Sequence, residues 1–149
     1  MTVRRGTVAD LAAICEIEAA SFGDPWSERD FRAAFGDPIC EYAIAEDGGA
    51  VIGYALYSSI YEDAEIMSLA VLPQMRRRGV GRALLSRVIE CVTVRGAETL
   101  FLEVRASNDA AIALYESFGF ERLRVIRNYY REPTEDAVAM SLALGAADN

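Results

Sequence analysis

The sequence predicts an α/β fold in which helices cover both faces of a mixed sheet. Three observations predict it: runs of β-forming residues bounded by turn signals, stretches with apolar residues at helical spacing, and an order of elements that reads β-α-α-β-β-β-α-β-α-β-β. The chain has 149 residues and shows neither an internal repeat nor a linker, so we expect one domain over residues 1–149.

The N-terminal part of the chain predicts one short strand and two helices. Residues 3–5 are typical of a strand, and apolar residues at helical spacing predict a helix over residues 8–20. Ser27 has the side chain of an N-cap, and the helix that it begins runs to Phe35 before Gly36-Asp37-Pro38 ends it.

Three strands are predicted next, the first two of them as a hairpin. The turn Asp47-Gly48-Gly49 separates a strand that contains Tyr42 and Ile44 from a strand over residues 51–57. An acidic turn then leads into a strand over residues 65–71. The middle of the chain therefore supplies consecutive strands to the sheet.

The C-terminal half alternates helices and strands. Apolar residues four apart predict a helix from Val80 that Gly96 ends, and Asn108 is the N-cap of a helix that extends to Phe118. The strands predicted here cover residues 99–104, 122–126 and 137–144, and we expect residues 145–149 to be a frayed tail.

The composition excludes several kinds of chemistry. The chain has no His and no Lys, so all 15 basic residues are Arg. These absences remove Ser-His-Asp and Cys-His catalysis, His-ligated metal sites and the lysine of a Walker A loop, and we expect no bound metal. The net charge of −8 argues against nucleic acid or an anionic membrane as a partner.

The cysteines and the N-terminus bear on the cellular compartment. Cys15, Cys40 and Cys91 are an odd number of widely separated thiols, and the first residues lack the apolar core of a signal peptide. We therefore expect free thiols and a cytoplasmic location. We also expect a monomer or a weak dimer.

The strongest local motif lies between a strand and a helix. It contains four arginines and two glycines in seven residues, namely Arg76, Arg77, Arg78, Gly79, Val80, Gly81 and Arg82. The start of a helix offers unpaired N–H groups and the positive end of its dipole, glycines allow the backbone to approach a ligand, and arginines bind phosphate oxygens. The pattern indicates a cradle for pyrophosphate, and a solvated basic turn is the alternative.

This motif carries a family resemblance. The stretch from Leu69 to Leu85 resembles the acetyl-CoA motif of the GNAT N-acetyltransferases, whose core is (Q/R)-x-x-G-x-(G/A), and Arg76, Gly79 and Gly81 match that core. The resemblance implies a GNAT-like fold with a mixed, mostly antiparallel sheet of six to seven strands and four flanking helices. It also implies acetyl-CoA as the donor.

Further segments are similar to one branch of that family, the RimI branch. They are residues 102–120, Pro25-Trp26-Ser27-Glu28 and Asn128-Tyr129-Tyr130, and the whole resemblance extends from about Val3 to Leu142. The branch acetylates the α-amine of protein N-termini, notably of a small-subunit ribosomal protein. The resemblance therefore implies a protein or peptide N-terminus as the acceptor.

The same resemblance implies roles for individual residues. Glu103 matches the general base, Tyr115 matches the acid that protonates the departing CoA thiolate, and Asn108 matches a residue that contacts the cofactor. The implied contacts to the pantetheine arm come from the backbone of Leu69, Ala70 and Val71, and those to the peptide come from Trp26, Tyr129 and Tyr130.

Other interpretations stay open at this point. Glu103 can be a solvated residue on a strand, Tyr115 can be a core aromatic, and the acidic residues 62, 63 and 65 can be a solvated turn or can attract a cationic N-terminus. For the whole chain, the alternatives are acetylation of a lysine or a small amine, a CoA-binding module without turnover, and a domain that binds a mononucleotide.

Overall fold

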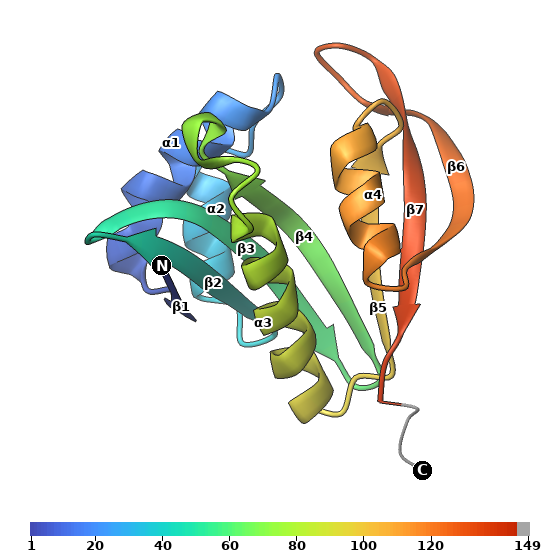
Figure 1. Ribbon diagram of the computed structural model, residues 1–149, viewed down its shortest axis with the longest axis horizontal. Helices are drawn as coiled ribbons and strands as arrows, with labels where there is room; N and C mark the ends of the chain where they lie inside the picture. The colour runs from blue at the N-terminus through green and yellow to red at the C-terminus, as the bar shows by residue number, and fades with distance from the viewer. Residues whose placement is uncertain (146–149) are drawn as a thin grey trace.

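The computed structural model describes residues 1–145, and in them a seven-stranded sheet carries helices on both faces (Figure 1). The expected fraying of the tail falls largely on residues 146–149, which lie outside the described residues. The strands are β1 (Thr2–Arg5), β2 (Cys40–Asp47), β3 (Ala50–Ile60), β4 (Asp63–Val71), β5 (Thr99–Arg105), β6 (Glu121–Tyr130) and β7 (Glu135–Ala143). The helices are η1 (Val8–Asp10), α1 (Leu11–Ser21), α2 (Glu28–Phe35), η2 (Pro73–Met75), α3 (Val80–Val94) and α4 (Asp109–Ser117).

The strand order is β1-β2-β3-β4-β5-β7-β6, and all neighbours are antiparallel except β4 and β5. The mixed sheet predicted from the sequence and the mostly antiparallel pairing implied by the resemblance are therefore confirmed, as are the four α-helices among the described residues. Within residues 1–145, no helix is long and apolar enough to cross a membrane.

The parallel pair β4 and β5 is joined only at its N-terminal end. Its register runs from Asp63 opposite Thr99 to Glu65 opposite Phe101, and the described residues contain no further pair between these strands. Beyond that point the two strands separate, as Figure 1 shows. We call the unpaired region between residues 66–71 of β4 and residues 102–105 of β5 the split.

A bulge in β4 lies at the beginning of the split. Ser68 lies opposite Leu56 and Ile66 lies opposite Tyr57, so Met67 is an extra residue in β4. A bulge of this kind bends its strand and increases the local twist. The bend accounts for the departure of β4 from β5.

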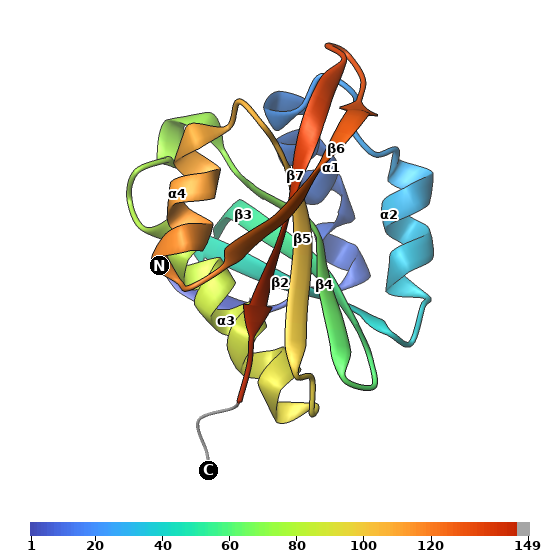
Figure 2. The same cartoon turned by 90° about the vertical axis from the view of Figure 1, so that its right-hand side faces the viewer.

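Helices cover both faces of the sheet, α3 and α4 on one and α1 and α2 on the other (Figure 2). An apolar cluster on each face holds them to the sheet. On one face α3 buries Leu84, Leu85, Val88 and Val92 completely, and α4 adds Ile112 and Tyr115. Each aliphatic side chain buried in this way stabilises the fold by about 1.5–3 kcal/mol. On the other face α1 and α2 cover β2, β3 and β4 with the side chains of Leu11, Ile14, Ile17, Phe31 and Ala34.

Local signals in the sequence explain the starts of α2 and α4 and the turn between β2 and β3. Ser27 Oγ accepts a hydrogen bond from Asp30 N at 3.2 Å, and Asn108 Oδ1 accepts one from Ala111 N at 3.1 Å. Both residues are the N-caps predicted from the sequence. The turn at Gly48 and Gly49 has φ values of 60° and 84°, as a tight hairpin with the usual strand twist requires.

The strand β6 is longer than the sequence predicts. It continues from Ile126 to Tyr130 through an irregular register, in which Asn128 has a φ of 53° and its N–H donates to Asp136 Oδ1 at 2.9 Å. Asn tolerates this left-handed conformation better than most residues do. The irregularity carries Tyr129 and Tyr130 to the end of the strand.

Candidate active site

The start of α3 lies on the α3 and α4 face of the sheet and has the backbone of an anion site. Gly79 is its N-cap with a φ of 81°, which L side chains rarely adopt, and the first N–H groups of α3 have no partner within the helix. A Cβ on Gly81 would lie 3.3 Å from Leu114 Cδ2, so the small residue lets α3 approach α4. This turn can receive a pyrophosphate closely.

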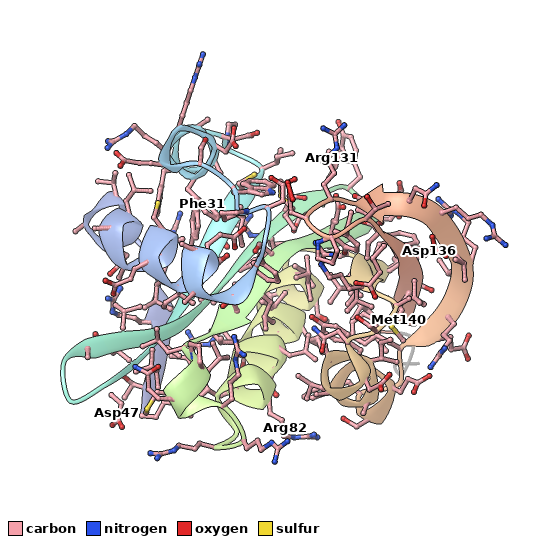
Figure 3. The ribbon with its side chains drawn as sticks, turned by 90° about the horizontal axis from the view of Figure 1, so that it is seen from above. Phe31, Asp47, Arg82, Arg131, Asp136 and Met140 are labelled. Carbon is pink, nitrogen blue, oxygen red and sulfur yellow. The ribbon has the colours of Figure 1, made fainter. Side chains whose placement is uncertain are left out.

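The four arginines of the motif do not act alike. Arg76 turns back, since its Nε donates to Val71 O at 3.0 Å and its NH2 donates to Ser21 Oγ at 3.2 Å. Arg82 extends towards α4, where its NH1 donates to Ser117 Oγ at 3.1 Å and its guanidinium lies 4.7 Å from the centre of the Phe118 ring. Figure 3 shows Arg82 at the edge of the molecule.

The two arginines between them, Arg77 and Arg78, are exposed. Arg76 and Arg82 therefore fix the turn to its neighbours in addition to any contact with a ligand. All four side chains of the predicted cradle are exposed, and the structure distinguishes Arg76 and Arg82, which bond to neighbouring segments, from Arg77 and Arg78.

One edge of β4 faces the split. Val71, Ala70 and Leu69 lie opposite Gly53, Tyr54 and Ala55 of β3. The described residues provide no strand pairing for the other edge of this part of β4. Apart from the Val71 carbonyl, which accepts from Arg76 Nε, backbone groups on that edge are available to a ligand that enters the split.

Glu103 lies on β5, at the opposite side of the split. Its neighbours Leu102 and Val104 point into the cluster beneath α3 and α4, so the Glu103 side chain points to the other face of the sheet. This alternation is the one predicted from the sequence. Glu65 of β4 interacts with it there: burial raises the pKa of the Glu65 carboxyl, and the negative charge of Glu103 raises that pKa further.

Two tyrosines from β6 complete this group. Burial raises the pKa of Tyr129, and the charges of Glu103 and Glu65 contribute to the increase. The rings of Tyr129 and Tyr130 meet edge to face with their centres 4.9 Å apart, and the Arg105 guanidinium lies 4.6 Å from the centre of the Tyr130 ring. The structure therefore brings two carboxylates and two phenols together beside the split.

Tyr115 reaches the region from α4. It is 7% exposed, its ring centre lies 5.5 Å from that of Phe120, and burial raises its pKa to about 12. Its hydroxyl is therefore protonated at neutral pH and is available as a proton donor. Tyr115 also affects the pKa of Tyr130, which links α4 to the group around Glu103.

Trp26 lies in the segment between α1 and α2, half-buried, with its ring centre 5.3 Å from that of Phe31. Seen from above in Figure 3, Phe31 lies with α1 and α2 in one half of the molecule, and Arg131 lies in the other half, in the loop between β6 and β7. Arg105 secures that loop by donating to Arg131 O at 2.7 Å and to Pro133 O at 2.9 Å.

Sequence reasoning undervalued Glu65 and missed Glu18. Glu65 begins the strand predicted over residues 65–71, and it was interpreted either as part of a solvated acidic turn or as a charge that attracts a cationic N-terminus. The structure places it within β4, where the charge of Glu103 raises the pKa of its carboxyl. Glu18 is 3% exposed, and its spacing of four from Ile14 and seven from Leu11 already places it on the buried side of α1. A carboxylate at such a position is a signal of a polar network or a site.

Comparisons with known proteins agree on one family. Residues 11–120 match the acetyltransferase (GNAT) family. The chain is 39% identical over 145 residues to the [ribosomal protein bS18]-alanine N-acetyltransferase of Escherichia coli K12, covering 96% of this chain and 97% of that protein. It is 37% identical over 146 residues to the N-alpha-acetyltransferase RimI of Mycobacterium tuberculosis, covering 94% and 90%.

Solved structures agree as well. The crystal structure of the ribosomal-protein-S18-alanine N-acetyltransferase from Escherichia coli superposes with a TM-score of 0.90 at 38% identity, covering 99% of this chain and 97% of that one.

Proposed function

Because the chain belongs to the acetyltransferase (GNAT) family and is therefore an acetyl-CoA-dependent N-acetyltransferase, we propose that its acceptor is the α-amine of a protein N-terminus. The names of its relatives support an N-terminal alanine on a small-subunit ribosomal protein as the substrate. Such a substrate would place the enzyme in the cytoplasm.

The donor fits the α3 and α4 face of the sheet. The first N–H groups of α3 and the exposed Arg77 and Arg78 would hold the pyrophosphate, and Gly79 and Gly81 allow it to approach the backbone. Residues 69–71 would bind the pantetheine arm along the unpaired edge of β4. N–H groups on that edge would also polarise the thioester carbonyl. Asn108, exposed at the start of α4, would add a contact.

The acceptor fits the opposite face, where Glu103 and Glu65 lie. Two carboxylates attract the ammonium form of an N-terminus, and Trp26, Tyr129 and Tyr130 would surround the first residues of the peptide. An α-amine has a pKa of about 7.7–8.0, so a carboxylate or an intervening water can remove its proton near neutral pH at little cost. Glu103 would serve as that base.

The reaction then needs no nucleophile from the protein. The proton of the amine goes to Glu103, the C–N bond forms, the C–S bond of the thioester breaks, and Tyr115 gives its hydroxyl proton to the departing thiolate. A thiol has a pKa of about 8.5, so the thiolate is a weaker base than the Tyr115 phenolate would be. Water must therefore return a proton to Tyr115 as the products leave.

One observation carries this proposal: the strands β4 and β5 separate between a helix start suited to pyrophosphate and a carboxylate suited to an amine. The direct test is acetyl transfer from labelled acetyl-CoA to two peptides of one sequence. Both begin with alanine and contain an internal lysine, and one of them has a blocked N-terminus.

Label on the free peptide alone is the expected result. Equal labelling of both peptides would show that the acceptor is the lysine side chain and would refute the proposed acceptor. Labelling of neither peptide, with acetyl-CoA bound, would refute the proposed acceptor and favour a small amine or a binding module.

A further inference from the structure

Glu18 of α1 is a buried carboxylate outside the group around Glu103. It is 3% exposed and lies among the apolar residues beneath α1 and α2. Burying a carboxylate costs free energy unless hydrogen bonds replace its water shell. An apolar side chain would pack at the same position without that cost, so packing alone does not account for a carboxylate here. Its hydrogen-bond partners indicate its role.

Three donors converge on this carboxylate. The hydroxyl of Tyr54 donates to Glu18 Oε1, Ser68 Oγ donates to the same oxygen at 3.1 Å, and the backbone N–H of Trp26 donates to Glu18 Oε2 at 3.0 Å. Tyr54 and Ser68 also lie within hydrogen-bond distance of each other, at 2.7 Å. Hydrogen bonds to a charged acceptor are roughly twice as strong as neutral ones.

Two of the three donors come from segments that border the site. Ser68 directly follows the bulged Met67, where β4 separates from β5. Trp26 belongs to the segment that connects α1 to α2. Glu18 therefore joins one wall of the split to the segment that carries Trp26, through a single carboxylate with one oxygen directed to each.

The same segment touches the opposite side of the acceptor region. A Cβ placed on Gly23 would overlap the carbonyl oxygen of Glu132, so the backbone between α1 and α2 lies against the loop between β6 and β7. Displacement of this segment would change its contact with that loop. The position of Trp26 therefore depends on two contacts, with Glu18 beneath it and with the β6–β7 loop at Gly23.

We propose that Glu18 is a positioning residue for the acceptor, which holds the segment of Trp26 against β4 so that the binding surface for the substrate N-terminus is formed before the substrate arrives. The proposal rests on the proposed acceptor site. Preorganisation lowers the ordering cost of binding, so loss of the carboxylate weakens acceptor binding and leaves the donor site unchanged.

Two variants of nearly equal size separate this role from packing. Glu18→Met removes every acceptor atom, and Tyr54 and Ser68, whose hydroxyl oxygens lie 2.7 Å apart, can then bond to each other. Glu18→Gln keeps one oxygen for the N–H of Trp26, and its NH2 group can donate to the two hydroxyls. Glu16→Met is the matched control, since Glu16 is exposed on the same helix.

The expected kinetic result is a change in binding of the peptide without a change in binding of acetyl-CoA. For Glu18→Met, the KM for the peptide rises at least about tenfold, whereas the Kd for acetyl-CoA stays within about twofold and kcat changes little. Glu18→Gln restores most of the affinity for the peptide. Glu16→Met behaves as the wild type.

A second readout does not depend on catalysis. The chain has one tryptophan, so intrinsic tryptophan emission reports on Trp26 alone. Glu18→Met shifts this emission to longer wavelength and increases its quenching by acrylamide, and Glu18→Gln does so much less. If the chain acetylated no peptide, the proposed function would fail while this measurement still decided whether Glu18 holds the segment.

Two outcomes would overturn the proposal. In the first, Glu18→Met lowers the melting temperature but leaves the emission of Trp26 and the KM for the peptide unchanged, which would make Glu18 a purely structural residue. In the second, Glu18→Met weakens acetyl-CoA and peptide to the same extent. If Glu18→Met did not fold, Ser68→Ala and Tyr54→Phe together would be measured by the same readouts, with a smaller shift expected because Trp26 keeps its bond.

Discussion

On the α3 and α4 face of the sheet, the groups beside the split are backbone atoms, glycines and arginines at the start of a helix. On the α1 and α2 face, they are carboxylates and tyrosines from β4, β5 and β6. The first set suits a ligand that needs to be held, and the second set suits a group that must lose a proton. The split in the sheet is where the two sets meet.

Because the two faces differ in this way, we expect substitutions on them to impair different properties of the enzyme. The donor side depends on backbone conformation, so a change that strains the turn at Gly79 should weaken binding of the donor alone. The acceptor side depends on the chemistry of individual side chains, so an isosteric change there should lower the rate with little change of structure. We expect the largest loss of activity from a substitution of Glu103.

Glu103→Gln should lower kcat by about 10²–10⁴-fold, because the amide cannot accept the proton of the amine. Steady-state rates with the alanine peptide measure this loss, and calorimetry should find the affinity for acetyl-CoA unchanged. Glu98→Gln, at an exposed position just before β5, is the control and should keep full activity. A Glu103→Gln enzyme with wild-type kcat/KM between pH 6 and 9 would contradict the base assignment.

Tyr115→Phe should lower kcat by about 10²-fold with little change in either KM, because the thiolate then leaves without its proton donor. Since burial raises the pKa of Tyr115 to about 12, the hydroxyl stays protonated throughout the working range. The pH dependence of the remaining activity should therefore match that of the wild type. Tyr61→Phe, at an 86% exposed position, is the control. Retention of kcat by Tyr115→Phe would leave Tyr115 as a core residue only.

Gly79→Ala should weaken acetyl-CoA about tenfold and leave the KM for the peptide unchanged. A Cβ at Gly79 meets no neighbouring atom, so the effect comes from the φ of 81°, which costs an L residue about 1–2 kcal/mol. Gly79→Asn should be milder, because Asn tolerates this conformation. Calorimetric titration with acetyl-CoA compares the two. Equal weakening by Ala and Asn would indicate a clash with the ligand instead of backbone strain.

Glu65→Gln should have the smallest effect, on stability. Burial and the charge of Glu103 raise the pKa of Glu65, so the folded protein binds this proton more tightly than the unfolded chain does. The contribution of Glu65 to stability is thus fully present below the unfolded pKa and is lost as pH rises through the folded pKa. The Gln variant should therefore melt at a higher temperature than the wild type at pH 7, and the advantage should vanish in acid. Thermal unfolding at both pH values measures it, and a lower melting temperature at pH 7 would contradict the interaction.

The local structure at the start of α3 was easier to predict from the sequence than the grouping of carboxylates and tyrosines on the opposite face. Gly79, Gly81 and the arginines are contiguous, and the rules for helix starts apply to them directly. The caps at Ser27 and Asn108 and the alternation of residues 99–105 could be predicted for the same reason, since each depends on near neighbours in the chain.

The rest depends on contacts between distant segments. The split is an absence of backbone pairing, and no pattern of side chains in β4 or β5 specifies it. Arg76 bonds to Ser21, and Glu18 bonds to Ser68, across 55 and 50 residues of sequence. The extension of β6 beyond Ile126 follows from a bond between Asn128 and Asp136 on the neighbouring strand.

The central claim is that donor and acceptor bind on opposite faces of the sheet and meet at the split. Two conjugates test it most directly: CoA joined through its acetyl group to the α-amine of an alanine peptide, and CoA joined to a lysine side chain of the same peptide. The α-linked conjugate should bind at least about 10²-fold more tightly than CoA and more tightly than the lysine-linked one, because both sites are engaged at once. An α-linked conjugate that binds no better than CoA would contradict the account.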